Sequence, residues 1–407
     1  MGQIKVVPRL KPLPYSSQDL QLELRKPILN KQVVFEDIEF YSNDDNPNNK
    51  RAFKYKPCRP NPAFTSMMYS TTDFPPFYCR LSYFDKSPGI LVDENLTTAT
   101  ALQGWRSARA NAVIREGTWY IEYRLIKSND GESHVRFGVA RREASLEAPV
   151  GFDGYGYGFR DKYGQTVHLS KQGSFLQNDQ FQTGDVVGLL IKLPDIKTQR
   201  RLASQQIHQQ TVGQPDLEVS VNEPAEIDIV RDQIPIKYKN QLYFEQYDYT
   251  VSKEMEHLLN PVTVFGEKAV RDTVKFEPCK LPNSSITVYK NGEFCGVAFK
   301  GLNAFLPPSS EQKHGKEVKG RISETKDDGS LGYYPMISCY NRGVIQLNTT
   351  PDILVPVDLQ DAISRGEVRI YNDRYEERIL EEYVYDLVDE VTNEYLDEIE
   401  RMSAPQT

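Results

Sequence analysis

The sequence predicts a mainly β protein: an antiparallel β-sandwich with long loop insertions, followed by one amphipathic α-helix at the C-terminus. Between residues 117 and 339, short runs of β-branched and aromatic residues alternate with glycine-containing turns, which is typical of strands on half-buried sheets. Residues 374–402 contain no glycine or proline and carry apolar side chains at helical spacing. Because no internal repeat is visible, we expect one large domain with insertions.

Five segments carry the strand prediction: residues 117–123, 135–139, 184–192, 286–299 and 333–339. In the second segment, Val135, Phe137 and Val139 share one face by alternation, whereas Arg136 points from the other face. The nearly continuous apolar run in the third segment favours a strand buried on both faces. Asn291-Gly292 predicts a hairpin within the fourth segment, and Pro335 places the fifth strand near a sheet edge.

The order of these segments resembles the pattern of a SPRY domain. The similarity includes Phe137-Gly-Val139, the hairpin that ends in Gly296-Val-Ala-Phe299, and Tyr334-Pro335. Residues 136–142 and 148–160 are similar to the Ash/Bre-type SPRY subunit of COMPASS, the assembly that methylates lysine four of the histone-three tail. This resemblance extends from about residue 104 to the C-terminus. It implies a non-catalytic scaffold subunit, located in the nucleus, beside a SET-domain methyltransferase subunit.

A candidate peptide-binding pocket surrounds two arginines. Arg136 projects from the polar face of its strand, and Arg160 follows a loop rich in aromatic residues. Two guanidinium groups beside rigid aromatic surface suit an acidic or phosphorylated peptide. The alternative is that the arginines form internal salt bridges and the aromatic residues are core. The resemblance implies that an acidic segment of a WD-repeat β-propeller subunit binds at Trp105, Arg136, Pro149, Phe152 and Arg160.

Two positions of this pocket differ from the family pattern. Trp105 and Phe152 stand where metazoan members have tyrosine, so the resemblance implies the apolar walls but neither a phenol hydrogen bond nor a strict preference for a phosphorylated ligand. The glycine string 154–158 lacks the spacing and the lysine-serine ending of a phosphate-binding loop, and we expect a mobile turn in the pocket.

The C-terminal helix has a second candidate binding surface, formed by Leu380, Tyr383, Val384, Leu387 and Val391. Acidic residues outnumber basic ones eleven to three over residues 374–402, and we expect these acids on the exposed side. The apolar stripe either packs on its own domain or lies in the groove of a partner. The resemblance favours a partner, a Dpy-type helical dimer, and residues 372–407 are assigned as a partner-binding helix.

Residues 1–60 are expected to form a poorly ordered extension, although residues 33–41 have the pattern of an edge strand. A possible weak DNA contact lies within residues 50–59, where the basic side chains are Lys50, Arg51, Lys54, Lys56 and Arg59. A solvated linker or a nuclear-import signal is the favoured alternative, because the net charge of -8 and the pI of about 5.4 argue against DNA as the principal ligand. Contact with the nucleosome is therefore expected to be indirect.

Residues 61–371 are assigned to the SPRY domain, with flexible insertions at about 194–235 and 307–330. The five cysteines lie too far apart for a zinc site, no common catalytic motif is present, and no apolar run approaches a membrane span. We therefore expect no metal, cofactor, small-molecule substrate or membrane association. The alternative functions are a SPRY substrate-recognition adaptor of a ubiquitin ligase and a nucleic-acid-binding protein.

Overall fold

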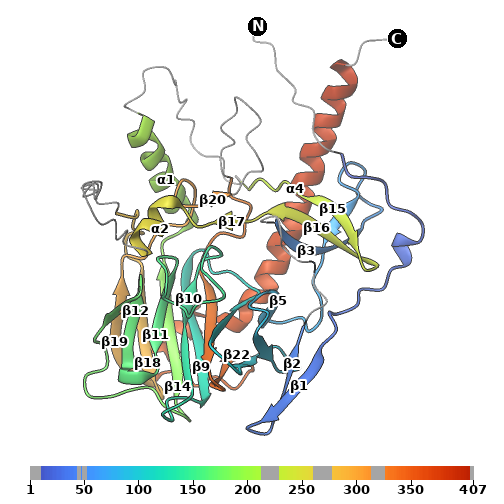
Figure 1. Cartoon of the computed structure of the whole chain (residues 1–407). Coiled ribbons are helices and arrows are strands. Elements are labelled where there is room, and N and C mark those ends of the chain that lie inside the picture. Colours follow the sequence, from blue (N-terminus) through green and yellow to red (C-terminus); the bar gives the residue numbers. More distant parts are fainter. Residues whose placement is uncertain are drawn as a thin grey trace, which may run out of the picture.

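The computed structural model describes residues 11–43, 47, 53–211, 229–259, 277–312 and 326–403. Its body is made of two large antiparallel sheets that pack face to face (Figure 1). The first, ten-stranded sheet has the order β1 (Asn30–Phe35), β2 (Ile38–Ser42), β6 (Ile90–Val92), β7 (Thr98–Ala101), β22 (Val344–Asn348), β9 (Gly117–Lys127), β14 (Val186–Leu193), β18 (Ser285–Lys290), β19 (Glu293–Lys300), with β23 (Arg369–Ile370) parallel to β9.

The second sheet has seven strands and carries the arginine pair. Its order is β13 (Lys171–Gly173), β12 (Gln165–His168), β11 (Gly156–Arg160), β10 (His134–Ala140), β21 (Tyr334–Tyr340), β8 (Trp105–Ala110), β5 (Leu81–Lys86). A third, four-stranded sheet has the order β15 (Ile234–Tyr238), β16 (Gln241–Tyr247), β3 (Phe53–Pro60), β4 (Tyr69–Thr71). A small sheet pairs β17 (Tyr249–Thr250) with β20 (Glu311–Gln312).

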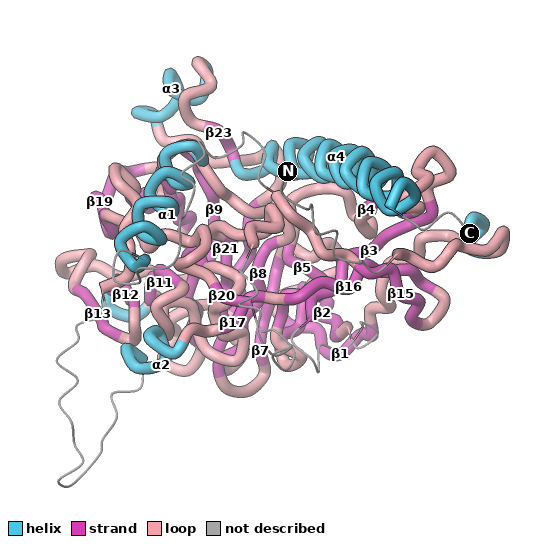
Figure 2. The backbone as a smooth tube through the Cα atoms, turned by 90° about the horizontal axis from the view of Figure 1, so that it is seen from above, coloured by secondary structure: helices cyan, strands magenta, loops and turns pink. Residues whose placement is uncertain are grey.

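Helices lie outside the sheets. They are α1 (Ile196–Thr211), α2 (Lys253–Leu259), α3 (Gln360–Ser364) and α4 (Arg374–Ser403), with 3-10 turns at Asp19–Gln21, Lys162–Gly164, Val357–Leu359 and Tyr371–Asp373. Seen from above, α4 lies alongside β3 and β4 of the third sheet (Figure 2). The predicted mainly β fold with a C-terminal helix is confirmed.

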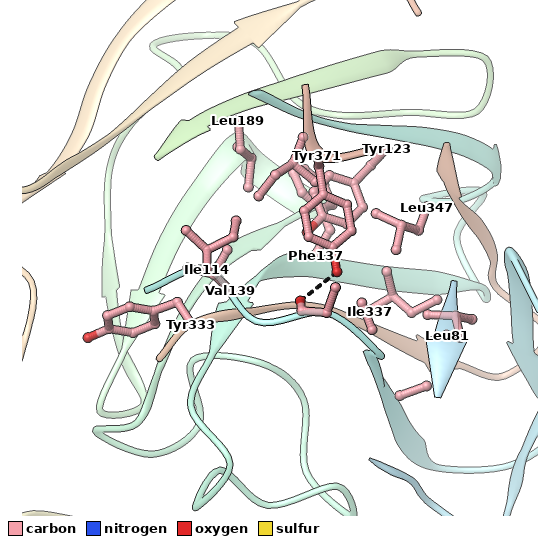
Figure 3. Close-up of a cluster of buried hydrophobic side chains, with 14 of the residues drawn as sticks. Leu81, Ile114, Tyr123, Phe137, Val139, Leu189, Tyr333, Ile337, Leu347 and Tyr371 are labelled. Atoms are coloured by element: carbon pink, nitrogen blue, oxygen red, sulfur yellow. Dashed lines mark hydrogen bonds between the residues drawn. The ribbon is translucent and has the colours of Figure 1, made fainter. Parts of the chain in front are cut away.

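The core fills the space between the two large sheets, because alternation points one set of side chains from each sheet inward. On β10, Val135, Phe137 and Val139 are fully buried. Figure 3 shows Phe137 and Val139 in the same cluster as Leu189 of β14 and Leu347 of β22. The prediction for the third segment is also confirmed: β14 buries Val187, Leu189 and Ile191 in this core, and Leu190 packs on the opposite face with Tyr120 and Tyr289 beneath α3.

Pro335 does not mark an edge strand, contrary to the sequence prediction. β21 lies in the middle of the second sheet, between β10 and β8. Pro335 is paired with Val139 of β10, whereas pairing with β8 begins one residue later, at Met336. The missing N–H therefore lies beyond the end of the neighbouring ladder, where its absence removes no hydrogen bond of that ladder.

The N-terminal residues are also more ordered than predicted. β1 and β2 form a hairpin at one end of the ten-stranded sheet, where Phe40 is fully buried against Leu91 and Val344. β3 is an inner strand of the third sheet. The edge strand predicted from residues 33–41 is thus present as part of this hairpin, whereas the composition of residues 1–60 did not indicate β3.

The two predicted insertions contain regular structure as well. Residues 196–211 form α1, and Glu311–Gln312 form β20. The remainder of the insertions, residues 212–228 and 313–325, lies outside the described residues. The glycine string 154–158 was expected to be a mobile turn, but Gly156 and Gly158 belong to β11. Glycine is needed there because a Cβ on Gly158 would lie 2.4 Å from the carbonyl oxygen of Val150.

Candidate functional site

Three of the predicted pocket residues, Trp105, Arg136 and Arg160, lie on the outer face of the second sheet, and we refer to this surface as the recess. Arg136 on β10 is paired directly with Arg160 on β11 and, on its other side, with Ser338 on β21. Because the inward neighbours Val135 and Phe137 are fixed in the core, alternation fixes the outward direction of Arg136. Both arginine side chains are partly exposed, so neither is locked in the interior.

The loop between β10 and β11 crosses over this face and forms one wall of the recess. The Ser107 hydroxyl donates to the Ala148 carbonyl at 2.8 Å, and the Val150 N–H donates to the Ser338 hydroxyl at 2.9 Å. These bonds hold residues 148–150 over Ser107 and Ser338, the neighbours of Arg136 across the sheet; Pro149 is buried, and Phe152 is 39% exposed. The structure thus brings Trp105, Arg136 and Arg160 together, with the loop that carries Pro149 lying over the same face.

Gly151 allows this loop to approach the sheet. Its φ is +83°, and a Cβ there would lie 2.2 Å from the carbonyl oxygen of Val167. A side chain at this position would meet backbone atoms that cannot move without disrupting β12. The conformation of the wall thus depends on glycine between Val150 and Phe152.

Trp105 forms the opposite wall. It begins β8, and the Arg136 guanidinium lies 5.0 Å from the centre of its ring, which is a cation–π contact. Tyr340 of β21 packs against Trp105 with ring centroids 5.3 Å apart. Sequence reasoning missed Tyr340, because its place next to Trp105 follows from the central position of β21.

The charge of the arginine pair is only partly compensated by the surrounding structure. Burial and the nearby charge of Arg160 lower the pKa of Arg136 to about 10, although the Asp161 carboxylate acts in the opposite direction, and the Nε of Arg136 is buried without a hydrogen-bond partner. Among the described residues, Arg160 donates only to the Gln165 side chain, at 3.0 Å, and neither arginine forms an ion pair. Two adjacent cations without an ion-pair partner would be stabilised by an anionic ligand, and each fork fits a carboxylate bidentately.

The C-terminal helix presents its apolar face to solvent. Leu380, Tyr383, Val384, Leu387 and Val391 are between 39% and 65% exposed, which is unusual for large apolar side chains at regular helical spacing. The predicted stripe is present, and it does not pack on the protein's own sheets. Tyr395, one turn beyond Val391, is exposed in the same way.

The acids of α4 were expected on its exposed side, which holds for Glu376, Glu394 and Glu398 but is wrong for a second group that faces inward: Glu382, Asp386, Asp389 and Glu390. The Glu390 carboxylate accepts the backbone N–H groups of Thr65, Ser66 and Met67 at 2.5, 3.0 and 2.7 Å. Asp386 accepts the N–H and the hydroxyl of Thr71 at 2.8 and 2.9 Å. The helix is therefore held to the body by its carboxylates.

Basic side chains complete this attachment. Arg231 pairs with Glu382, Asp386 and Asp389, and Lys56 lies 2.6 Å from Glu382. Burial alone would raise the pKa of Glu382, but Lys56, Arg231 and Arg378 outweigh that effect and lower it to about 2. This inward-facing charge leaves the apolar face exposed.

Two of the basic side chains in residues 50–59, the segment considered for DNA contact, form ion pairs within the protein. Lys54 is buried and pairs with Asp328, and Lys56 pairs with Glu382, so these two side chains are not free for phosphates. Arg59 is exposed on β3. Lys50 and Arg51 lie outside the described residues.

Within the described ranges, no cluster of three or more metal-binding side chains is found, and all five cysteines are free thiols. The helices of this part include none that is long and apolar enough to cross a membrane. The fold and the two surfaces thus define a class: a β-sandwich interaction protein with an unpaired arginine recess and a presented apolar helix.

Comparisons with known proteins identify the family. The chain is 35% identical to the Set1 complex component ash2 of Schizosaccharomyces pombe, over 96% of this chain and 53% of the relative. It is 36% identical to the COMPASS component cclA of Colletotrichum higginsianum, over 87% of this chain and 69% of the relative. It is 31% identical to the COMPASS component BRE2 of Saccharomyces cerevisiae, over 87% of this chain and 89% of the relative. The chain belongs to this Ash2/Bre2/cclA family of COMPASS components.

This family membership places the chain with COMPASS components rather than with ubiquitin-ligase adaptors. The chain spans about half the length of the S. pombe relative. No protein-family model matches the sequence. Among solved structures, the SPRY domain of human HERC1 aligns with 64% of this chain and 92% of that chain at 12% identity, with a TM-score of 0.31.

Proposed function

We propose that this protein is a non-catalytic scaffold subunit of a nuclear COMPASS-type complex, which supports methylation of lysine four of the histone-three tail by a SET-domain subunit. The observation that carries the proposal is the pairing of Arg136 with Arg160 on adjacent strands, without a carboxylate partner among the described residues. Family membership supplies the biological context.

In this proposal the recess holds an acidic segment of the WD-repeat β-propeller subunit. Carboxylates of that segment would pair with the two guanidinium groups, and its apolar side chains would lie between Trp105 and the Pro149–Phe152 wall. The exposed face of α4 would bind the Dpy-type helical dimer. A surface of the sandwich would contact the SET-domain subunit and order its mobile segment, which lowers the free-energy cost of reaching the active arrangement.

The recess is tested by a pull-down of a β-propeller subunit with the full chain. Arg136→Ala and Arg160→Ala should each abolish retention, because each removes one of the two carboxylate-binding forks, while the circular dichroism spectrum stays unchanged. Arg59→Ala, an exposed arginine on β3, is the matched control and should bind like the wild type. Wild-type binding by both recess variants would exclude the recess as the propeller site.

The helix is tested by co-purification with the helical dimer. Leu387→Ala and Val384→Ala should lose the dimer and keep the β-propeller subunit, since both side chains lie on the exposed stripe. Thr392→Ala, also exposed on α4, is the control. Retention of the dimer together with a lowered melting temperature would show that these residues stabilise the fold instead.

The scaffold role itself is tested by histone methylation assays with the reconstituted SET-domain subunit. Adding the wild-type chain should raise the rate on a histone-three peptide, and the Arg136→Ala variant should raise it less. A rate that is independent of the chain would contradict the proposal.

A further inference from the structure

The direction of the Arg136 side chain depends on the ring of Trp105. The Arg136 guanidinium lies 5.0 Å from the centre of that ring, whereas its Nε is buried without a hydrogen-bond partner among the described residues. Arg160, in contrast, donates a hydrogen bond to the side chain of Gln165, its neighbour on β12, at 3.0 Å. The two guanidinium groups are therefore held in different ways, one by an aromatic face and the other by an amide.

Trp105 itself has a neighbouring strand on one side only. It is the first residue of β8, and β5, the strand beyond it, pairs with β8 at Ala108 and Ala110 and not at Trp105. On the other side, Trp105 is paired with Tyr340 of β21. The two rings pack with centroids 5.3 Å apart and an interplanar angle of 35°. Among the described strands, Tyr340 is thus the cross-strand neighbour that limits movement of the Trp105 ring.

The backbone of Tyr340 is fixed on both sides and at its end. Tyr340 is the last residue of β21, and its second cross-strand neighbour is His134 of β10. The chain then turns through Asn341 and Arg342, both at positive φ, and the Gly343 N–H donates to the Tyr340 carbonyl at 3.0 Å. A tight turn closed by this hydrogen bond leaves little freedom to the residue that precedes it. Tyr340 can therefore act as a fixed support for the ring beside it.

We propose that Tyr340 is a positioning residue of the recess, which holds the Trp105 ring against the Arg136 guanidinium and so orders this fork before an acidic segment binds. The proposal rests on the function proposed for the recess and adds a residue that acts through Trp105. Ordering a long side chain in advance removes part of the entropic cost of binding. Tyr340 does not have to touch the ligand for this effect.

The first measurement is the affinity of the full chain for a fluorescein-labelled, glutamate-rich peptide, by fluorescence anisotropy. Tyr340→Ala should weaken binding about tenfold, because the Trp105 ring and the Arg136 side chain must then be ordered when the peptide binds. Tyr340→Phe keeps the packed ring and should bind like the wild type. Tyr340→Leu replaces Tyr340→Ala if the latter fails to fold, which thermal melting shows.

A double-mutant cycle separates positioning from a general loss of structure. Arg136→Lys keeps a cation but removes the planar fork that lies against Trp105. In this background Tyr340→Ala should weaken binding by less than about threefold, because its effect passes through that fork. Gln165→Ala is the matched control: it acts on Arg160, and its effect should be the same in both backgrounds.

A second measurement follows the Trp105 ring in the absence of ligand. The chain contains two tryptophans, and Trp119 is 1% exposed, so that acrylamide quenches mainly the fluorescence of Trp105. Tyr340→Ala should increase the quenching of the free protein, because the Trp105 ring loses the face that covers it. Tyr340→Phe should leave the quenching unchanged.

The two claims fail in different ways. Unchanged affinity and quenching in Tyr340→Ala, an equal loss of affinity in Tyr340→Phe, or a full effect of Tyr340→Ala in the Arg136→Lys background would overturn the role of Tyr340. Peptide binding that is absent in the wild type, or that is unaffected by Arg136→Ala, would instead refute the function of the recess. In that case the quenching of the free protein still decides whether Tyr340 holds Trp105 in place.

Discussion

Because α4 contacts the body through carboxylates and exposes its apolar side chains, substitutions at two adjacent residues should have opposite effects on stability. Glu390 is 5% exposed, and its carboxylate accepts three backbone N–H groups and the Thr65 hydroxyl. Val391 is 65% exposed. We expect Glu390→Gln to destabilise the fold and Val391→Ala to leave its stability nearly unchanged, although large-to-small changes of apolar residues are usually the costly ones.

The magnitude follows from the bonds that change. Hydrogen bonds to a charged group contribute about 1.5–3 kcal/mol each, and those to a neutral group about half as much. Glutamine keeps one acceptor oxygen but turns the other into an NH₂ donor, so that at least one of the buried N–H groups of residues 65–67 loses its acceptor, at a cost of about 1–3 kcal/mol. Together these terms give about 2–4 kcal/mol for Glu390→Gln, against less than about 0.5 kcal/mol for Val391→Ala.

Urea unfolding at neutral pH, followed by fluorescence and by circular dichroism, measures both changes. Glu394→Gln is the matched control, because Glu394 lies one turn further on and accepts only the Thr65 hydroxyl at 2.9 Å in an exposed position. Its effect should stay below about 1 kcal/mol. Equal stabilities of Glu390→Gln and wild type, or a larger loss in Val391→Ala, would refute the inward orientation of the acidic face.

Two further predictions concern the pH dependence and the recess wall. The pKa of Glu382, lowered to about 2 from an ordinary value of 4.5, means that this carboxylate stabilises the fold above about pH 4.5 and that up to about 3 kcal/mol is lost as the pH falls toward 2. Urea unfolding between pH 7 and 3 should show a shallower decline in Glu382→Gln, and an identical decline would contradict this. Gly151→Ala should lower stability by about 1–3 kcal/mol and weaken peptide binding, whereas Gly131→Ala, with a positive φ but open space around it, should leave binding intact; equal binding losses would exclude the wall as the cause.

The recess was largely predictable from the sequence because its geometry depends on local alternation. Once Val135 and Phe137 are assigned to the core, Arg136 must face outward, and the glycine-rich strand β11 brings Arg160 beside it. The contribution of Tyr340 was not predictable, since it depends on β21 lying between β10 and β8. Pro335 led to the prediction of an edge strand. A proline is tolerated in this central strand because the pairing of β21 with β8 begins only at Met336, one residue later.

The orientation of α4 was not predictable, because periodicity shows that a helix has two faces but not which one is buried. The usual rule places apolar residues inward. Here the body offers free backbone N–H groups at residues 65–67 and the cations Lys56 and Arg231, which fit carboxylates and not leucine. The orientation therefore depends on the chemistry of the receiving surface, which is assembled from distant parts of the chain.

The two proposed binding surfaces depend on separate parts of the molecule. The recess is built on β8, β10, β11 and β21, whereas α4 is anchored through β3, β4 and residues 65–67, and the residues named in the two sets do not overlap. Substitutions at sites without shared partners act additively. A rigid scaffold that holds both partners raises their effective concentration for each other without changing its own shape. We therefore expect that Arg136→Ala leaves the affinity of the helix for its own partner unchanged and that Leu387→Ala leaves the affinity of the recess unchanged. Any cooperativity between the partners in the wild type would then arise from tethering and not from a conformational signal through the sheets.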